Sequence, residues 1–322
     1  MRGMQPKAQG SRLKPVADTL ESVGFVSKGD RKLLSVKAQT EYFSKITERY
    51  VKFCHDNNKD LGAAFISMPT SASNDATSNP PAALPSTKRN AVDKSIPSAS
   101  SELSTLLLSL RKLREAILAT AKETPIEFIQ RVHIFSIRLS IRARHPPSYF
   151  PSLRYSLERL HTRAHPLRQT DLNDVVSYLI LDYACRQNDM VSALELRAHA
   201  RRDFAFADTE IDQALCALMH GNWVLFWRVR KNVDSSKQAV MDWAMAQMRR
   251  RALKAVGSAY LSVPVELVVG ECTGYDEDWT WEKLVEHENL GWEKEGERII
   301  IRRPKIRPPA KPETAPTGGA GP

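Results

Sequence analysis

The spacing of apolar residues in the middle of the chain constrains the fold more than any other feature of the sequence. From Ser101 to about Ser262 the secondary-structure signals are almost wholly helical. The first segment repeats apolar residues three and four apart at Leu103, Leu106, Leu107, Leu110, Leu113 and Ile117. Further helices are predicted after Thr124-Pro125, around Leu153 to Leu160, through TDLNDVVSYLILDYACRQND and from Met190 to about Arg202. Short polar turns between such helices predict antiparallel hairpins stacked as a solenoid, with no strict sequence period.

An aromatic cluster, HGNWVLFWRVR, occupies residues 220–230. Gly221 suits a left-handed helix C-cap, and Asn222 suits the N-cap of the next helix. Trp223, Phe226 and Trp227 are spaced i, i+3 and i+4, so they are expected to face the preceding helix as core residues. A base-stacking platform and a ligand cage are the alternatives, but helical spacing alone explains the cluster.

A long helix is predicted from SSKQAVMDWAMAQMRRRALKAVGSAYLS, with Ser235 and Ser236 as its cap. Its apolar stripe comprises Met241, Met245, Met248, Ala252, Val256 and Ala259. Arg250 and Lys254 lie opposite this stripe, near Trp243. A basic face with a tryptophan is compatible with phosphate contact, but it is more often the solvated side of a helix.

The pattern changes after Val263. VPVELVVGEC predicts a short helix that starts at Pro264, and YDEDWTWEKLVEHENL predicts a second with Trp281, Leu284 and Val285 inward. LGWEKEGERIIIRRP then predicts a β-hairpin around a Glu-Gly turn. One long helix, two short helices and a hairpin are the order of a winged helix.

Composition divides the chain into five regions. Residues 1–68 form a basic N-terminal region with one amphipathic helix, and 69–101 form a Pro/Ser-rich linker expected to be disordered. The helical-hairpin repeat covers 102–234, the long helix and winged helix cover 235–304, and 305–322 form a disordered basic, Pro-rich tail.

Charge is distributed unevenly, although its total is +10. The hairpin region and the C-terminus are basic, whereas the stretch from Glu266 to Glu297 is strongly acidic. The four cysteines form no Cys-x-x-Cys pair, which favours a reducing compartment over a disulfide framework or a zinc knuckle. No apolar run is long enough for a bilayer and no hydrophobic leader follows the N-terminus, so cytoplasm or nucleus is expected.

Helical hairpins that run into a winged helix, with GNW between hairpins, SAYLSVPVELVV at the junction and NLGW before the wing, resemble the PCI-domain family. The resemblance covers roughly residues 103–303. It is most similar to the branch of signalosome subunit eight, the proteasome-lid subunit Rpn-twelve and subunit k of translation initiation factor three, with the Sac-three/GANP mRNA-export branch a close relative. It implies a mainly α, PCI-like fold and a non-catalytic scaffold subunit. The motif residues, all structural in role, are Gly221, Asn222, Tyr260, Pro264, Gly291 and Trp292.

The sequence contains little evidence for a catalytic or metal-binding motif. His161 and His165 have metal-pair spacing, but HTRAH lacks the glutamate of zinc proteases and has no third ligand. Asp276, Glu277 and Asp278 lack an EF-hand loop, and there is no phosphate-binding glycine loop or Gly-x-Ser-x-Gly elbow. We therefore expect no catalytic, cofactor or metal residues.

Two functions remain, protein binding and nucleic-acid binding, and the charge of the predicted winged helix distinguishes them. A winged helix that reads DNA presents a basic helix to the major groove, whereas the corresponding helix here is acidic. We expect protein subunits as partners, bound through Trp279, Glu282 and Glu286, with Trp279 exposed and Trp281 in the core. The alternative is an RNA or mRNA-export adaptor that uses Arg250 and Lys254.

Overall fold

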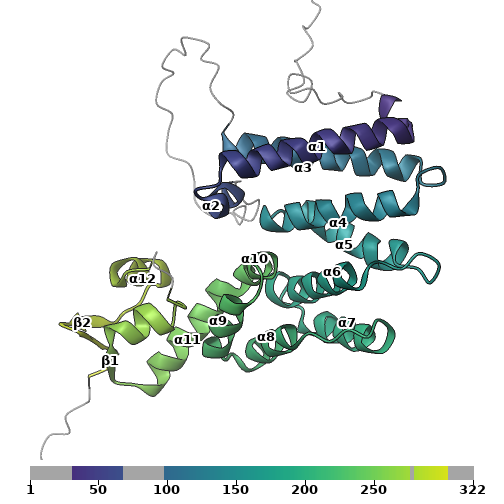
Figure 1. Cartoon of the computed structure of the whole chain (residues 1–322). Helices are drawn as coiled ribbons and strands as arrows, with labels where there is room; N and C mark the ends of the chain where they lie inside the picture. The colour runs from purple at the N-terminus through teal and green to yellow at the C-terminus, as the bar shows by residue number, and fades with distance from the viewer. Residues whose placement is uncertain (1–30, 68–97, 276–278, 304–322) are drawn as a thin grey trace, which may run out of the picture. The chain divides into compact units, whose positions relative to one another are not determined.

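The chain is mainly helical, with one small antiparallel sheet near its C-terminal end (Figure 1). The computed structural model describes residues 31–67, 98–275 and 279–303. Within these ranges the chain forms two compact units. The N-terminal unit comprises the residues up to Ile211 together with Val233–Asp242, and the C-terminal unit comprises Asp212–Asn232 together with the residues from Trp243 onward. The expected boundary at 234/235 does not coincide with this division.

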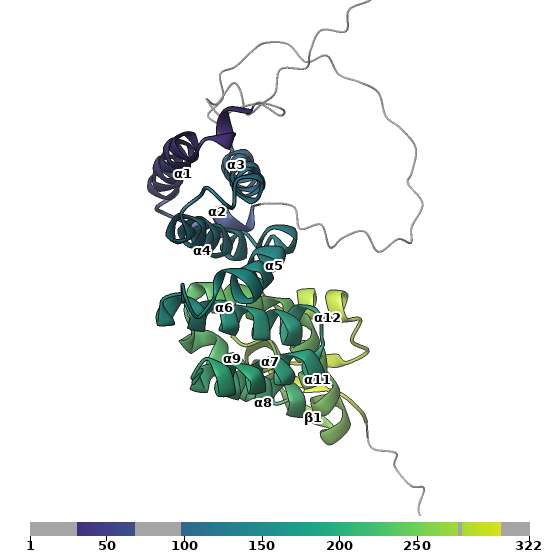
Figure 2. The same cartoon turned by 90° about the vertical axis from the view of Figure 1, so that its right-hand side faces the viewer.

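The N-terminal unit begins with a helix that has the expected amphipathic pattern, α1 (Val36–Asp56), after a 3-10 turn at Arg31–Leu34. Tyr42, Ile46 and Phe53 are buried on its inner face. Its partner is α3 (Ala99–Ala119), and α4 (Ile126–Arg142) lies beside α3, as both views show (Figures 1 and 2). Helix α1 therefore shares one core with the hairpins that follow it.

Side-chain contacts connect α1 to its two neighbours, α4 and α3. Phe43 makes edge contacts with Phe128 and Phe135 of α4. Arg49 donates two hydrogen bonds to Glu102, of 2.8 and 2.7 Å. A short helix, α2 (Leu61–Ile66), ends the first described range. Ser98 caps α3, so the last residues of the expected linker belong to this helix, and its remainder lies outside the described ranges.

Helices α5 to α7 complete the first set of hairpins. The pair Pro146-Pro147 opens α5 (Pro146–Tyr155), so this helix starts earlier than the segment predicted around Leu153 to Leu160. Helix α5 continues into a π-helical turn, Ser156–Leu160, and α6 (Gln169–Leu181) continues into another, Asp182–Arg186. Helix α7 (Met190–Asp203) then follows, with Asp189 as its N-cap.

The second π-helical turn is built around a buried carboxylate. Asp182 is fully buried and accepts hydrogen bonds of 2.7 Å from the Tyr149 hydroxyl and from Nε of Arg186. Burial and the neighbouring Asp182 raise the pKa of Tyr149, so its hydroxyl stays a donor. This network joins α5 to α6.

The Gly-Asn pair joins α8 (Thr209–His220) to α9 (Trp223–Asn232) in the predicted way. Gly221 has φ of +63°, and Asn222 Oδ1 accepts a hydrogen bond of 3.0 Å from the Leu225 backbone N–H. Phe226 is fully buried, whereas Trp223 and Trp227 are only half-buried. The expectation that all three aromatics lie inside is therefore correct for Phe226 alone.

The predicted long helix from Ser235 is wrong as a single element. It is divided into α10 (Ser235–Met241), a 3-10 turn at Asp242–Ala244 and α11 (Met245–Ala259). Its cap is Asp234, which accepts from the Ser236 and Lys237 backbone, not Ser235 or Ser236. Asp242 forms an ion pair with Arg144, and α10 packs on α4 and α6, which explains why this helix belongs to the N-terminal unit.

The sheet contains three strands in the order β1-β3-β2, namely β1 (Ser262–Pro264), β2 (Glu293–Glu295) and β3 (Arg298–Ile300). The β2–β3 hairpin confirms the prediction, and Gly296 has φ of +61° in its turn. Strand β1 is a correction, because Pro264 ends this strand and does not open a helix. The helical residues are 265–271, including a π-helical turn at Leu267–Glu271.

Helix α12 (Trp281–Glu288) packs on the π-helical turn Leu267–Glu271 and shares a core with α11 and the sheet in the C-terminal unit. The shared core contains Ala252, Leu253, Val256, Val263, Val268, Cys272, Leu284 and Ile299. Of the predicted inner face of α12, Leu284 is fully buried, and Trp281 and Val285 are half-buried.

Candidate protein-interaction surface

Trp279 precedes α12 instead of lying on it. Thr280 is the N-cap of α12 and accepts from the Lys283 backbone, so the helix begins only at Trp281. The expected division between an exposed Trp279 and a core Trp281 is therefore wrong, because it assumed that both lie on one helix. Both indoles are half-buried against the C-terminal core.

The Trp279 ring is held by two side chains. The Arg249 guanidinium carbon lies 4.0 Å from the ring centroid, and the His287 ring meets the indole edge to face at 5.2 Å. A guanidinium at this distance over an indole makes a cation–π interaction. Trp279 therefore contributes to the fold of the C-terminal unit as well as to its surface.

Arg249 also joins α11 to α12 through an ion pair that sequence reasoning missed. Its Nε lies 2.7 Å from Glu288 Oε1, and the two side chains are only 6% and 5% exposed. The sequence does contain a signal for this burial. Arg249 precedes Ala252, Leu253 and Val256 by three, four and seven residues, which places it on the same helical face as these core residues.

The outer side of α12 is acidic. Glu282 and Glu286 are both exposed and lie one turn apart. Hydrogen bonds from its own backbone N–H and from the Thr280 hydroxyl lower the pKa of Glu282, so this carboxylate is charged at neutral pH. In the described part of the chain neither glutamate forms an ion pair. The neighbouring Asp276–Asp278 lie outside the described residues.

The basic face of α11 is smaller than its Arg-rich sequence indicates. Arg249 is buried, and Nη1 of Arg251 donates a hydrogen bond of 2.7 Å to the backbone oxygen of Leu218. Arg250 and Lys254 are exposed and one turn apart, and their side-chain cations have no ion-pair partner among the described residues. Two neighbouring cations of this kind can contact only a short stretch of a phosphate backbone.

Several of the expected motif residues have identifiable contacts. A Cβ on Gly257 would lie 2.9 Å from the Trp292 ring, so a glycine is needed where Trp292 packs on α11. A Cβ on Gly274, whose φ is +82°, would lie 2.6 Å from the Trp227 ring. Trp227 therefore covers the loop that follows residue 271. No atom lies within 4 Å of a Cβ built on Gly291, so close packing does not explain this glycine.

Exposed apolar residues occur where α11 meets the sheet. Tyr260 and Leu261 are 51% and 54% exposed, although Tyr260 was expected to be structural. The Leu261 backbone oxygen accepts hydrogen bonds from Ile301 and Arg302, which fixes this junction to the strand β3 end. Aromatic residues are enriched in protein interfaces, so the exposed Tyr260 is a candidate contact residue.

The two histidines with metal-pair spacing have structural contacts. Nδ1 of His161 accepts a hydrogen bond of 3.2 Å from the Leu167 backbone, and its ring packs on Phe204. The His165 backbone oxygen accepts from Gln130. No group of three or more His, Cys, Asp or Glu side chains suited to a metal ion occurs within residues 31–67, 98–275 and 279–303.

The fold and this surface define a mainly helical protein with a small C-terminal sheet, an acidic helix and an exposed aromatic junction. No protein-family model matches the chain, and no curated protein matches its sequence. Among the described helices, none has the length and apolar character required to cross a membrane.

Replacing Trp279 by alanine is expected to lower the free energy of unfolding by about 1–2 kcal/mol, because a partly exposed cation–π contact and some apolar burial are lost. Urea denaturation followed by tryptophan fluorescence measures this change. All six tryptophans lie between Trp223 and Trp292 in the C-terminal unit, so the signal reports that unit alone. Trp279→Phe keeps a ring face and should retain most of the stability. Unchanged stability in the alanine variant would contradict the packing role of Trp279.

Proposed function

We propose that the protein is a non-catalytic scaffold subunit of the PCI type, which binds other protein subunits of a large complex in the cytoplasm or nucleus. The proteasome lid, the signalosome and the initiation-factor assembly are complexes of the expected class. The order α11, β1, helical residues 265–271, α12, β2, β3, with β3 central, supports a winged helix in the C-terminal unit.

The observation that carries this proposal is the exposed acidic side of α12. In a winged helix that reads DNA, the corresponding helix approaches phosphates. Glu282 and Glu286 would repel those phosphates, and Arg249 cannot compensate because it is buried against Glu288. A protein surface with complementary positive charge fits this helix better.

The exposed pair Tyr260 and Leu261 supports the same proposal. Desolvated aromatic residues contribute a large share of interface energy, whereas exposed charges mainly set specificity and association rate. The C-terminal unit carries both kinds of residue, so it has the chemistry of a protein-binding surface.

The alternative partner is RNA, and the exposed pair Arg250 and Lys254 is the observation that favours it. These cations lie on α11, which carries no exposed acidic residue within one turn of them. RNA binding through this pair would weaken strongly with added salt.

Charge reversal distinguishes the two partners. Glu282→Lys with Glu286→Lys should reduce co-purification of protein subunits with the full chain at least about tenfold, because like charges across an interface are costly. Quantitative mass spectrometry of native pull-downs measures this loss. Arg250→Glu with Lys254→Glu is the matched control and should leave the same subunits bound.

The opposite pattern would favour the RNA adaptor. In that case the control variant abolishes salt-sensitive RNA binding in cross-linked extracts, and the α12 variant retains all its partners. Each of the four residues is exposed, so both double variants should remain folded, which thermal denaturation checks.

A further inference from the structure

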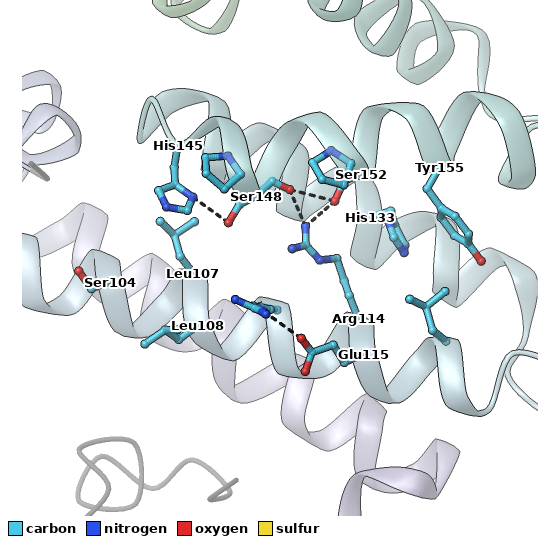
Figure 3. Close-up of a pocket in the computed structure, with 14 residues that line it drawn as sticks. Ser104, Leu107, Leu108, Arg114, Glu115, His133, His145, Ser148, Ser152 and Tyr155 are labelled. Atoms are coloured by element: carbon cyan, nitrogen blue, oxygen red, sulfur yellow. Dashed lines mark hydrogen bonds and ion pairs between the residues drawn. The ribbon is translucent and has the colours of Figure 1, made fainter. Parts of the chain in front are cut away.

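A cavity of about 720 Å³ opens in the N-terminal unit between α3 and α5 (Figure 3). Its walls are largely apolar and include Leu108 and Leu118 of α3 and Pro151 of α5. Leu108 and Leu118 are 47% and 51% exposed, although they are large apolar side chains. The volume lies within the range of small-molecule sites, which is about 300–1,000 Å³.

Arg114 provides a positive charge inside this cavity (Figure 3). Its Nη1 donates hydrogen bonds of 2.8 Å to Ser136 Oγ and to the Ser148 backbone oxygen, and it also bonds Ser152 Oγ. These acceptors are all uncharged. In the described part of the chain, Nε and Nη2 of Arg114 have no hydrogen-bond partner, and the guanidinium has no carboxylate partner. Burial lowers the Arg114 pKa to about 10, so the group remains a cation at neutral pH.

His133 of α4 is the second polar group of the cavity. Its side chain is buried, with 3% exposure, and neither ring nitrogen has a hydrogen-bond partner. The imidazole stacks on Tyr155 at 4.9 Å and lies between Arg114 and Tyr155 in Figure 3. Burial and the nearby Arg114 lower the His133 pKa to about 3, so the ring is neutral with one donor and one acceptor. Because both ring nitrogens are buried, the ring contributes a neutral wall beside Arg114 and not a contact for a ligand.

The charges of the cavity favour a monoanion. Arg111 at the rim is already paired with Glu115, with 2.9 Å between Nε and Oε1. Among the lining residues, Arg114 is therefore the arginine without a carboxylate partner. The nearby Glu115 carboxylate would repel a dianion such as phosphate more strongly than a monoanion. The free Nε and Nη2 of Arg114 form the planar fork that matches a carboxylate.

We propose that this cavity binds a small organic acid, with its carboxylate on Nε and Nη2 of Arg114 and its apolar body against Leu108, Leu118 and Pro151. This site is independent of the proposed scaffold function, since all of its residues belong to the N-terminal unit.

Titration of the full chain with hexanoate tests the proposal. The Nε–H signal of Arg114 in ¹⁵N NMR should shift on binding, and calorimetry should give an affinity at least about tenfold higher than that of acetate, because of the added apolar burial. Hexanamide lacks the charge and should bind at least about tenfold more weakly than hexanoate, since it loses charge-assisted hydrogen bonds. Equal or tighter binding of inorganic phosphate, or no shift with hexanoate, would overturn the proposal.

Variants locate the binding to this cavity. Leu108→Glu places a negative charge at the mouth without disturbing the core, and it should weaken hexanoate at least about tenfold through like-charge repulsion. Val191→Glu on α7, where Val191 is 67% exposed, is the matched control and should bind like the unmodified chain. Equal affinities in both variants would place the binding elsewhere and overturn the assignment. Because Arg114→Gln also removes bonds that hold Ser136, Ser148 and Ser152, the exposed Leu108 is the better probe.

Discussion

Replacing Arg249 by alanine is expected to lower the free energy of unfolding of the C-terminal unit by about 3–5 kcal/mol, the usual cost of removing one partner from a buried ion pair. Glu288, only 5% exposed, would lose its buried guanidinium partner and keep only the exposed His287 ring, whose Nδ1 lies 3.3 Å from its Oε1. The variant also loses the guanidinium that lies 4.0 Å over the Trp279 ring. Urea denaturation followed by tryptophan fluorescence measures the change, because every tryptophan lies in this unit.

The neighbouring residue supplies the control. Arg250→Ala removes the same side chain from an exposed position on the same helix, and it should change stability by no more than about 0.5 kcal/mol. A double variant, Arg249→Met with Glu288→Leu, should recover most of the stability, because replacing both members of a buried pair by apolar residues is often neutral. Similar effects of Arg249→Ala and Arg250→Ala would show that the pair does not hold α11 to α12.

Helices with a regular apolar face could be predicted from the sequence. The faces of α1 and α3 follow directly from residues spaced three and four apart, and Gly221 and Asn222 mark the α8–α9 junction through backbone requirements that few other residues meet. These features depend on local physical chemistry, which the sequence contains. The β2–β3 hairpin belongs to the same class, since its turn is two residues long.

Elements that depend on distant contacts could not be predicted in the same way. The break at Asp242–Ala244 interrupts a continuous apolar stripe, and Asp242 pairs with Arg144, which lies far away in the chain. Strand β1 has three residues and ends in a proline, so it exists only because it pairs with β3. Local spacing contains no information on such pairing.

For the candidate interaction surface, too, local features could be predicted and distant contacts could not. Glu282, Glu286, Arg250 and Lys254 are exposed as expected, since charged residues opposite an apolar face usually are. Trp279 was misplaced because the start of α12 depends on Thr280 as its cap. The pairing of Arg249 with Glu288, 39 residues apart, follows only from the packing of α11 against α12.

Replacing Phe226 by alanine is expected to cost about 3–5 kcal/mol of stability, as large-to-small changes at fully packed aromatic sites do. Phe226 is completely buried, and its ring meets the Trp227 ring edge to face at 5.1 Å. Within the aromatic cluster of residues 220–230, it is the aromatic side chain with no exposed surface. The cavity left by its removal would lie beside Trp227, so the fluorescence of that indole should also change.

Substitutions of its neighbours separate a packed helix junction from a base-stacking platform. Trp223→Ala and Trp227→Ala should each destabilise the C-terminal unit less than Phe226→Ala, because both indoles are half-buried. Val224→Ala, at a position 47% exposed, is the control and should change stability by no more than about 0.5 kcal/mol. If the two tryptophan variants kept full stability and lost binding to single-stranded RNA, the aromatic cluster would be a stacking platform. A graded loss of stability in the order Phe226, the tryptophans and Val224 instead assigns the cluster to the packing of α9 within the C-terminal unit.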